Sequence, residues 1–116
     1  MTIDASGYVT VLTTVGGAEA AKAIGRALVE RRLAACVQSV PITCCYAWEG
    51  RINEDAEVLL LIKTRAELYS QVEAAISELH AYATPEIVCL PIVMGSRPYL
   101  DWIAEVTATS SPRTSS

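Results

Sequence analysis

The fold is decided by residues 36–64, CVQSVPITCCYAWEGRINEDAEVLLLIKT, which predict two long strands joined by one tight turn. Gly50 supplies the turn. Pro41 has no N–H to give to a strand ladder, so we expect the first strand to bend or bulge there. Residues 58–62 are apolar at five consecutive positions, which indicates that both faces of the second strand are buried.

Helical and extended segments alternate around this hairpin. Residues 8–15 predict a strand, and residues 18–35 and 65–80 place apolar side chains at helical spacing. Pro85 stops the second helix, and residues 86–93 predict a further strand. The order is βαββαβ, which is typical of an α+β fold, the ferredoxin-like sandwich. A short C-terminal helix follows, with one apolar side made by Tyr99, Trp102, Ile103 and Val106.

The chain of 116 residues, 52% of them hydrophobic, is long enough for one compact domain with a single core. We expect that domain to span residues 8–106. Residues 1–7 form an N-terminal extension, and residues 107–116 are a Ser/Thr-rich tail that we expect to be disordered.

A ferredoxin-like sandwich covers only one face of its sheet with helices, whereas the apolar residues 58–62 predict that both faces of the sheet are buried. The chain has no spare segment for a second layer. Other copies of the same chain, closed by cyclic symmetry, are the most economical cover. The pattern therefore predicts self-association.

Composition excludes several classes of partner and location. The net charge is −4, with nine Lys and Arg against thirteen Asp and Glu, so nucleic acid and anionic membranes are not expected partners. No apolar run approaches the roughly 20 residues that span a bilayer, and the N-terminus lacks the pattern of a secretory signal, so we expect a cytoplasmic protein. The four cysteines show no C-x-x-C spacing and are interpreted as reduced thiols in strands.

Four segments resemble one known family: ALVERRLAACV (27–37), YAWEGRINEDAEVLLLIKT (46–64), HAYATPEI (80–87) and YLDWI (99–103). Together they are similar, in order and in register from about residue 8 to residue 106, to the divalent-cation tolerance protein CutA family. The resemblance implies a ferredoxin-like protomer in a homotrimer, with sheets facing inward and helices outside. It also implies a part in the response to copper and other divalent metal ions, with copper binding. The PII signalling proteins, trimers of similar topology, bind small ligands in clefts between subunits, which by fold analogy suggests a regulatory role.

The resemblance brings together three candidate metal ligands, His80, Cys36 and Glu86. A thiolate with an imidazole suits copper or zinc better than magnesium. His80 is the only histidine and follows the second helix, so the alternative is a capping or interface histidine that bonds a backbone carbonyl. The sequence leaves open whether the three side chains converge.

The resemblance also implies a candidate ligand cleft between subunits, formed by Tyr46, Trp48, Glu57, Lys63 and Tyr82. Tyr46 and Trp48 share one face of a strand, and Glu57 and Lys63 share a face of the next. The alternative is structural, with the aromatic residues in a trimer contact and the charged pair as a solvated rim.

Two functional hypotheses follow. The first is a homotrimeric cytoplasmic protein of divalent-cation tolerance that needs no cofactor but binds copper or another divalent cation. The alternative is a trimeric small-molecule-binding or signalling scaffold in which metal binding is incidental. We expect no enzymatic activity, because the chain lacks Gly-x-Ser-x-Gly and its single histidine has no assignable nucleophile.

Overall fold

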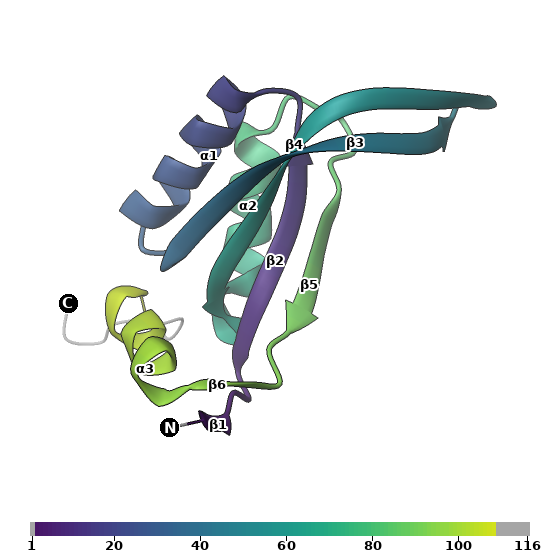
Figure 1. The fold of residues 1–116 in the computed structure, drawn as a ribbon. Coiled ribbons are helices and arrows are strands. Elements are labelled where there is room, and N and C mark those ends of the chain that lie inside the picture. Colours follow the sequence, from purple (N-terminus) through teal and green to yellow (C-terminus); the bar gives the residue numbers. More distant parts are fainter. Residues whose placement is uncertain (1, 109–116) are drawn as a thin grey trace.

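The computed structural model describes residues 2–108 of the chain (Figure 1). Its elements, in chain order, are β1 (Thr2–Asp4), β2 (Tyr8–Val15), α1 (Ala18–Glu30), β3 (Cys36–Trp48), β4 (Arg51–Arg65), the 3₁₀ turn η1 (Ala66–Leu68), α2 (Tyr69–Leu79), β5 (Ile87–Pro91), β6 (Met94–Ser96) and α3 (Arg97–Val106). The predicted α+β class, the βαββαβ order and the short C-terminal helix are confirmed.

The main sheet has the strand order β3-β4-β2-β5, with every neighbouring pair antiparallel. Helices α1 and α2 lie together on one face of this sheet (Figure 1). Pairing of β3 with β4 runs from Cys36↔Lys63 to Trp48↔Arg51, whereas β2 accompanies β4 only as far as Val58. The far part of the β3–β4 hairpin therefore projects beyond the sheet, as Figure 1 shows at the right.

The turn at the hairpin tip has two residues, Glu49 with φ 52° and Gly50 with φ 74°. Positive φ at both positions is the two-residue turn whose twist suits a tight hairpin. The bulge that we expected at Pro41 does not form, because β3 and β4 stay in register through it. Since β3 is an edge strand, a proline can be accommodated there without loss of a ladder bond.

Several boundaries differ from the prediction. The first helix ends at Glu30 and not at residue 35, because Arg32 takes a left-handed conformation with φ 61°. The predicted strand 86–93 is shorter and spans Ile87–Pro91.

The core lies between the helices and the covered face of the sheet. Apolar side chains at alternate strand positions, Val9, Val11, Val15, Leu60 and Ile62, meet a stripe from the helices, Ala21, Ile24, Leu28, Val72, Ala75 and Ile76. On α1, Gly25 allows close packing, since a Cβ there would lie 3.2 Å from Cγ1 of Val37. A Cβ at this position would require the Val37 side chain to shift by a few tenths of an ångström.

The opposite face of the sheet is apolar and is covered by no helix of the described residues except at one end, where α3 approaches it. The register places seven apolar side chains on this open face: Leu12, Val40, Ile42, Leu59, Leu61, Val88 and Leu90. Val40, Val88 and Leu90 are 41%, 43% and 49% exposed. The apolar run 58–62 thus divides as expected between two faces, with Leu60 and Ile62 in the core.

Both ends of the chain add structure that the sequence reading placed outside the domain. Residues 2–4 form β1, which pairs with β6 in a second, two-stranded sheet. At the other end, Thr107 is buried, and the Ala108 N–H donates to the carbonyl of Arg32 at 2.8 Å. The packed chain therefore reaches two residues into the segment expected as a disordered tail. Residues 109–116 of that segment lie outside the described residues.

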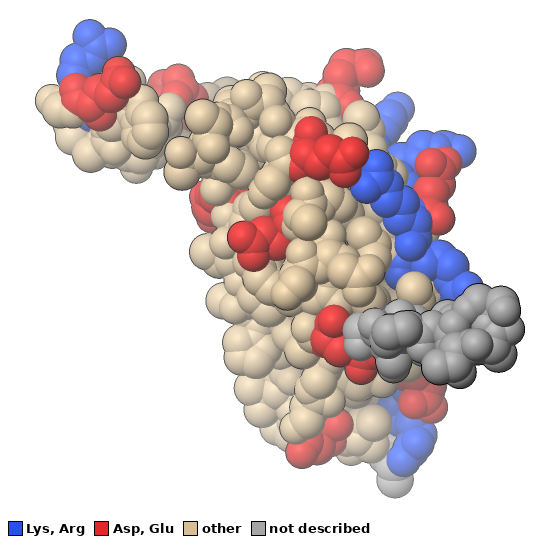
Figure 2. Space-filling model, turned by 180° about the vertical axis from the view of Figure 1, so that it is seen from behind, with Lys and Arg blue, Asp and Glu red and all other residues tan. Residues whose placement is uncertain are grey.

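In the part of the chain that the structure describes, no helix is both long enough and apolar enough to cross a membrane. Figure 2 shows the molecule from behind, with Lys and Arg gathered along the edge where α1 and α3 lie. Acidic side chains are interspersed with them, so the face in view carries no continuous basic surface of the kind that binds nucleic acid.

The hydroxyl of Thr13 gives the first testable prediction. Its side chain is fully buried in β2, and its Oγ1 has no hydrogen-bond partner in the described residues. An unpaired buried hydroxyl costs roughly 1–3 kcal/mol, so Thr13→Val is expected to raise the free energy of unfolding, by about 1 kcal/mol or more. Thr64→Val is the matched control, because the equally buried Thr64 donates to the Leu33 carbonyl at 2.7 Å. Denaturant unfolding should show that Thr13→Val raises the free energy of unfolding and that Thr64→Val lowers it. A Thr13→Val variant that is less stable than the parent protein would contradict the prediction.

Candidate functional site in the hairpin pocket

A pocket of about 660 Å³ lies where the β3–β4 hairpin meets the segment between α2 and β5; we call it the hairpin pocket. It is lined by Thr14, Cys44, Cys45, Tyr46, Trp48, Glu57, Tyr82, Ala83, Thr84 and Glu86. Alternation along β3 brings Cys44, Tyr46 and Trp48 to one face. Tyr82, in the segment after α2, lies over this face. The lining holds two carboxylates and no Lys or Arg.

Glu57 of β4 connects the two sides of the hairpin pocket. Its Oε2 accepts a hydrogen bond from Oη of Tyr82 at 2.9 Å, and its Oε1 accepts one from Sγ of Cys44 at 3.4 Å. Two residues away on the same face, Asp55 accepts a bond from Oη of Tyr46 at 2.5 Å. Both phenols therefore act as donors to carboxylates, and Glu57 fastens the segment after α2 to the hairpin.

The pKa values of the pocket's phenols and of one thiol are raised. The hydrogen bond to Asp55, followed by burial and the charges of Asp55 and Glu57, raises the pKa of Tyr46 to about 12. The pKa of Tyr82 is raised chiefly by its bond to Glu57, and burial, followed by Glu57, raises the pKa of the Cys44 thiol. These groups stay neutral at physiological pH, so the charge of the hairpin pocket is negative.

His80 closes α2 and is bonded through both ring nitrogens. Its Nε2 lies 2.6 Å from the carbonyl oxygen of Thr14, and its Nδ1 accepts the Tyr82 N–H at 3.1 Å. A neutral ring protonated on Nε2 satisfies both bonds. The His80 and Tyr82 rings lie 4.6 Å apart between centroids. His80 thus orients Tyr82 over the pocket.

The three predicted metal ligands do not come together within one protomer. Glu86 lines the hairpin pocket and His80 bonds Thr14. Cys36 pairs with Lys63, in the row of Thr10, about 13 Å along the strands from the row of Thr14. Among residues 2–108, no three His, Cys, Asp or Glu side chains are grouped so that they could hold a metal ion. The metal site stays a prediction that needs another copy of the chain.

Of the five predicted cleft residues, Tyr46, Trp48, Glu57 and Tyr82 all line the hairpin pocket. Lys63 does not. It shares the face of Glu57 but lies six residues further along β4, about 20 Å away.

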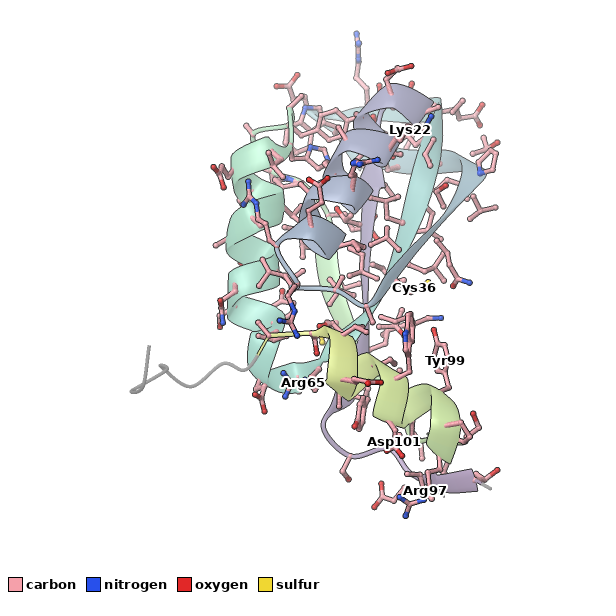
Figure 3. The ribbon with its side chains drawn as sticks, turned by 90° about the vertical axis from the view of Figure 1, so that its left-hand side faces the viewer. Lys22, Cys36, Arg65, Arg97, Tyr99 and Asp101 are labelled. Carbon is pink, nitrogen blue, oxygen red and sulfur yellow. The ribbon has the colours of Figure 1, made fainter. Side chains whose placement is uncertain are left out.

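Lys63 belongs to a second cluster beside α3. Its Nζ donates to Oε1 of Gln38 at 3.0 Å and lies 5.9 Å from the ring centroid of Tyr99. Figure 3 shows Tyr99 on α3 close to Cys36 at the start of β3. Burial, followed by the influence of Cys36, raises the pKa of the Tyr99 phenol. This cluster and the hairpin pocket occupy opposite ends of the open face.

The sequence reading assigned no role to Asp55 or Thr14. Asp55 could have been found by its spacing, because it precedes Glu57 by two residues on one strand face and lies opposite Cys44. Thr14 gave no such signal, since its contribution is a backbone carbonyl.

The raised pKa of Tyr46 gives a second prediction. A pKa of about 12 means that the bond to Asp55 is present below pH 10 and is lost as the pH rises through about 12. Asp55→Asn removes the charged acceptor, so we expect the pKa of Tyr46 to fall towards the ordinary value of about 10. Ultraviolet titration of phenolate absorbance measures this shift, with Tyr46→Phe identifying the signal. An unchanged titration in Asp55→Asn would show that Asp55 does not control Tyr46.

Comparison with known proteins assigns the chain to a family. The model of the family described as CutA1 divalent ion tolerance protein matches residues 9–106. The chain belongs to this family. The resemblance read from the four sequence segments is confirmed, and the matched residues include the main sheet except Tyr8, together with α1, α2 and α3.

Relatives and solved structures of the family agree with this assignment. The divalent-cation tolerance protein CutA of Thermus thermophilus is 50% identical over 98 residues, which cover 84% of this chain and 95% of that protein. Protein CutA of Mus musculus is 42% identical over 112 residues, covering 91% of this chain and 63% of the mouse protein. The structure of CutA from Synechococcus elongatus superposes with a TM-score of 0.90 at 32% identity, covering 93% of this chain and 96% of that one.

Family members differ in where they are found. The Arabidopsis thaliana relative is named a chloroplastic protein, and the Archaeoglobus fulgidus structure is described as a periplasmic divalent cation tolerance protein. Membership in the family therefore does not fix a compartment.

Proposed function

We propose that this protein acts as a homotrimer in tolerance of divalent cations. The observation that carries the proposal is the open face of the sheet, with Val40, Val88 and Leu90 exposed in a single copy. Monomeric soluble proteins rarely expose several large apolar side chains together on one sheet face. Three sheets facing inward, with α1 and α2 outside, bury it without an additional layer.

The projecting hairpin supports the same assembly. The far part of β4, residues 51–57, has no β2 partner within the chain, and β3 is an edge strand over its whole length. Free edges of this kind pair readily with another chain. A hairpin that crosses onto the neighbouring copy would satisfy them.

We further propose that the trimer binds copper or another divalent cation through His80, Cys36 and Glu86, with ligands contributed by more than one copy. The support is the family's tolerance of divalent ions together with the soft thiolate and imidazole donors. Within one copy His80 has both nitrogens engaged, so metal binding would have to displace one of these bonds. We propose no catalytic activity and no required cofactor, and the cytoplasmic location stays a prediction.

Calorimetric titration of copper into the reduced, tag-free protein tests this proposal. Saturable binding is expected, lost in Cys36→Ser and in His80→Ala, because each removes a ligand. Cys89→Ser is the matched control, since this cysteine lies on β5 and belongs to no predicted site. If copper does not bind, or if it still binds to both ligand variants, the proposed metal site is rejected. The proposal of a trimer does not depend on that result.

The hairpin pocket supports a second candidate, a trimeric scaffold that binds a small molecule and for which metal is incidental. Its volume of about 660 Å³ suits a molecule and not a bare ion, and four predicted cleft residues line it. A ligand of the folded protein raises the melting temperature as its concentration rises. A metabolite screen without any such shift would count against this candidate.

A further inference from the structure

The hairpin pocket combines aromatic faces with negative charge. Tyr46, Trp48 and Tyr82 are 40%, 55% and 42% exposed although they lie around one hollow. Large aromatic side chains exposed together mark a surface that binds something. The face of an aromatic ring is the negative side of its quadrupole and attracts cations within about 6 Å of the ring centroid.

The carboxylates of the hairpin pocket also favour a cation, because they add negative charge to that of the aromatic faces. Glu57 and Glu86 line it, and Asp55 adjoins it through Tyr46. No Lys or Arg lines it, so an anionic ligand would meet no opposite charge. The raised pKa values of Tyr46, Tyr82 and Cys44 agree with this, since nearby carboxylates contribute to each.

A bare metal ion does not fit these features. The described residues offer no group of three His, Cys, Asp or Glu side chains that could hold one, and Glu57 is already bonded to Tyr82 and Cys44. The volume far exceeds that of an ion. A cation with an apolar body uses both the aromatic faces and the charge.

We propose that the hairpin pocket binds a small organic ammonium compound, with its cationic head against Trp48 and Tyr82 and its charge balanced by Glu57 and Glu86. The inference deepens the second candidate function, ligand binding in this pocket. It does not require the copper site.

Choline and 3,3-dimethylbutan-1-ol provide a matched pair of probes, because they share one shape and only choline carries a charge. Calorimetry on the 116-residue chain at fixed ionic strength should show saturable choline binding, about tenfold tighter than binding of the alcohol. Equal affinities, or no binding of choline, would overturn the inference.

Two exposed positions place the ligand without threatening the fold. Trp48→Leu and Glu86→Gln are each expected to weaken choline binding about three- to tenfold. The controls are Trp102→Leu, which removes a 38% exposed tryptophan on α3, and Glu19→Gln in the first turn of α1. Equal losses in variants and controls would overturn the site.

The chain contains two tryptophans, so their indole N–H signals in an NMR spectrum report the location directly. Choline should shift the signal that disappears in Trp48→Leu and leave the Trp102 signal in place. A shift of the Trp102 signal alone would place the ligand elsewhere and overturn the inference.

The molar mass, measured on the same sample, distinguishes the proposal of a trimer from the proposal of choline binding. A single chain that binds choline rejects only the trimer, and a trimer that ignores choline rejects only this inference.

Discussion

Leu90→Asp is expected to convert the proposed trimer into single folded chains. Leu90 lies on the open face of β5 and is 49% exposed in one copy, so a carboxylate there stays solvated in the isolated chain. In the trimer the same carboxylate would be buried without a partner, which costs roughly 3 kcal/mol or more for each copy. That corresponds to about a hundredfold weaker association at every interface.

Analytical ultracentrifugation measures this change, and circular dichroism shows whether the single chains stay folded. Val29→Asp is the matched control, because Val29 is similarly exposed, at 43%, but lies on α1 in the helix layer. It should leave the mass unchanged. If Leu90→Asp kept the mass of the parent protein, the open face would not be the contact surface.

Leu28→Ala is expected to lower the free energy of unfolding by about 2–5 kcal/mol. Leu28 is fully buried between α1 and the sheet, so its truncation removes apolar contacts and leaves a cavity. Because the stability of a whole domain is about 5–15 kcal/mol, this single change removes a large part of it.

Denaturant unfolding of both proteins gives the difference, with Leu79→Ala as the control. Leu79 ends α2 and is 39% exposed, so the same substitution there should cost less than about 1 kcal/mol. Equal losses at the two positions would mean that the core does not lie where the structure places it.

The fold was predictable because its signals are local. The apolar and β-branched runs of β2 and β4 and the helical period of α1 and α2 can each be read from about ten residues. The run of residues 58–62 also predicted an apolar face that one chain does not cover. The register confirms this, since alternate residues of that run point into the core and onto the open face.

The small β1–β6 sheet could not be read in the same way. Each strand has only three residues, too few to show a period. Their pairing joins the two ends of the domain, which no local pattern reports. The same is true of Ala108, which bonds Arg32 far away in the sequence.

The site was predicted only where a single strand or turn determined it. Tyr46 and Trp48 share a face because they are two residues apart, and the pocket contains both. The separation of Glu57 and Lys63 also follows from the sequence, because six residues of one strand span about 20 Å. Whether His80, Cys36 and Glu86 meet depends on tertiary and quaternary contacts, which spacing does not determine.

The molar mass of the purified protein in solution tests the central claim most directly. Sedimentation equilibrium across a wide range of concentrations should give three times the 12.4 kDa of one chain. A single chain that remained monodisperse at high concentration, with the open face in water, would contradict the account.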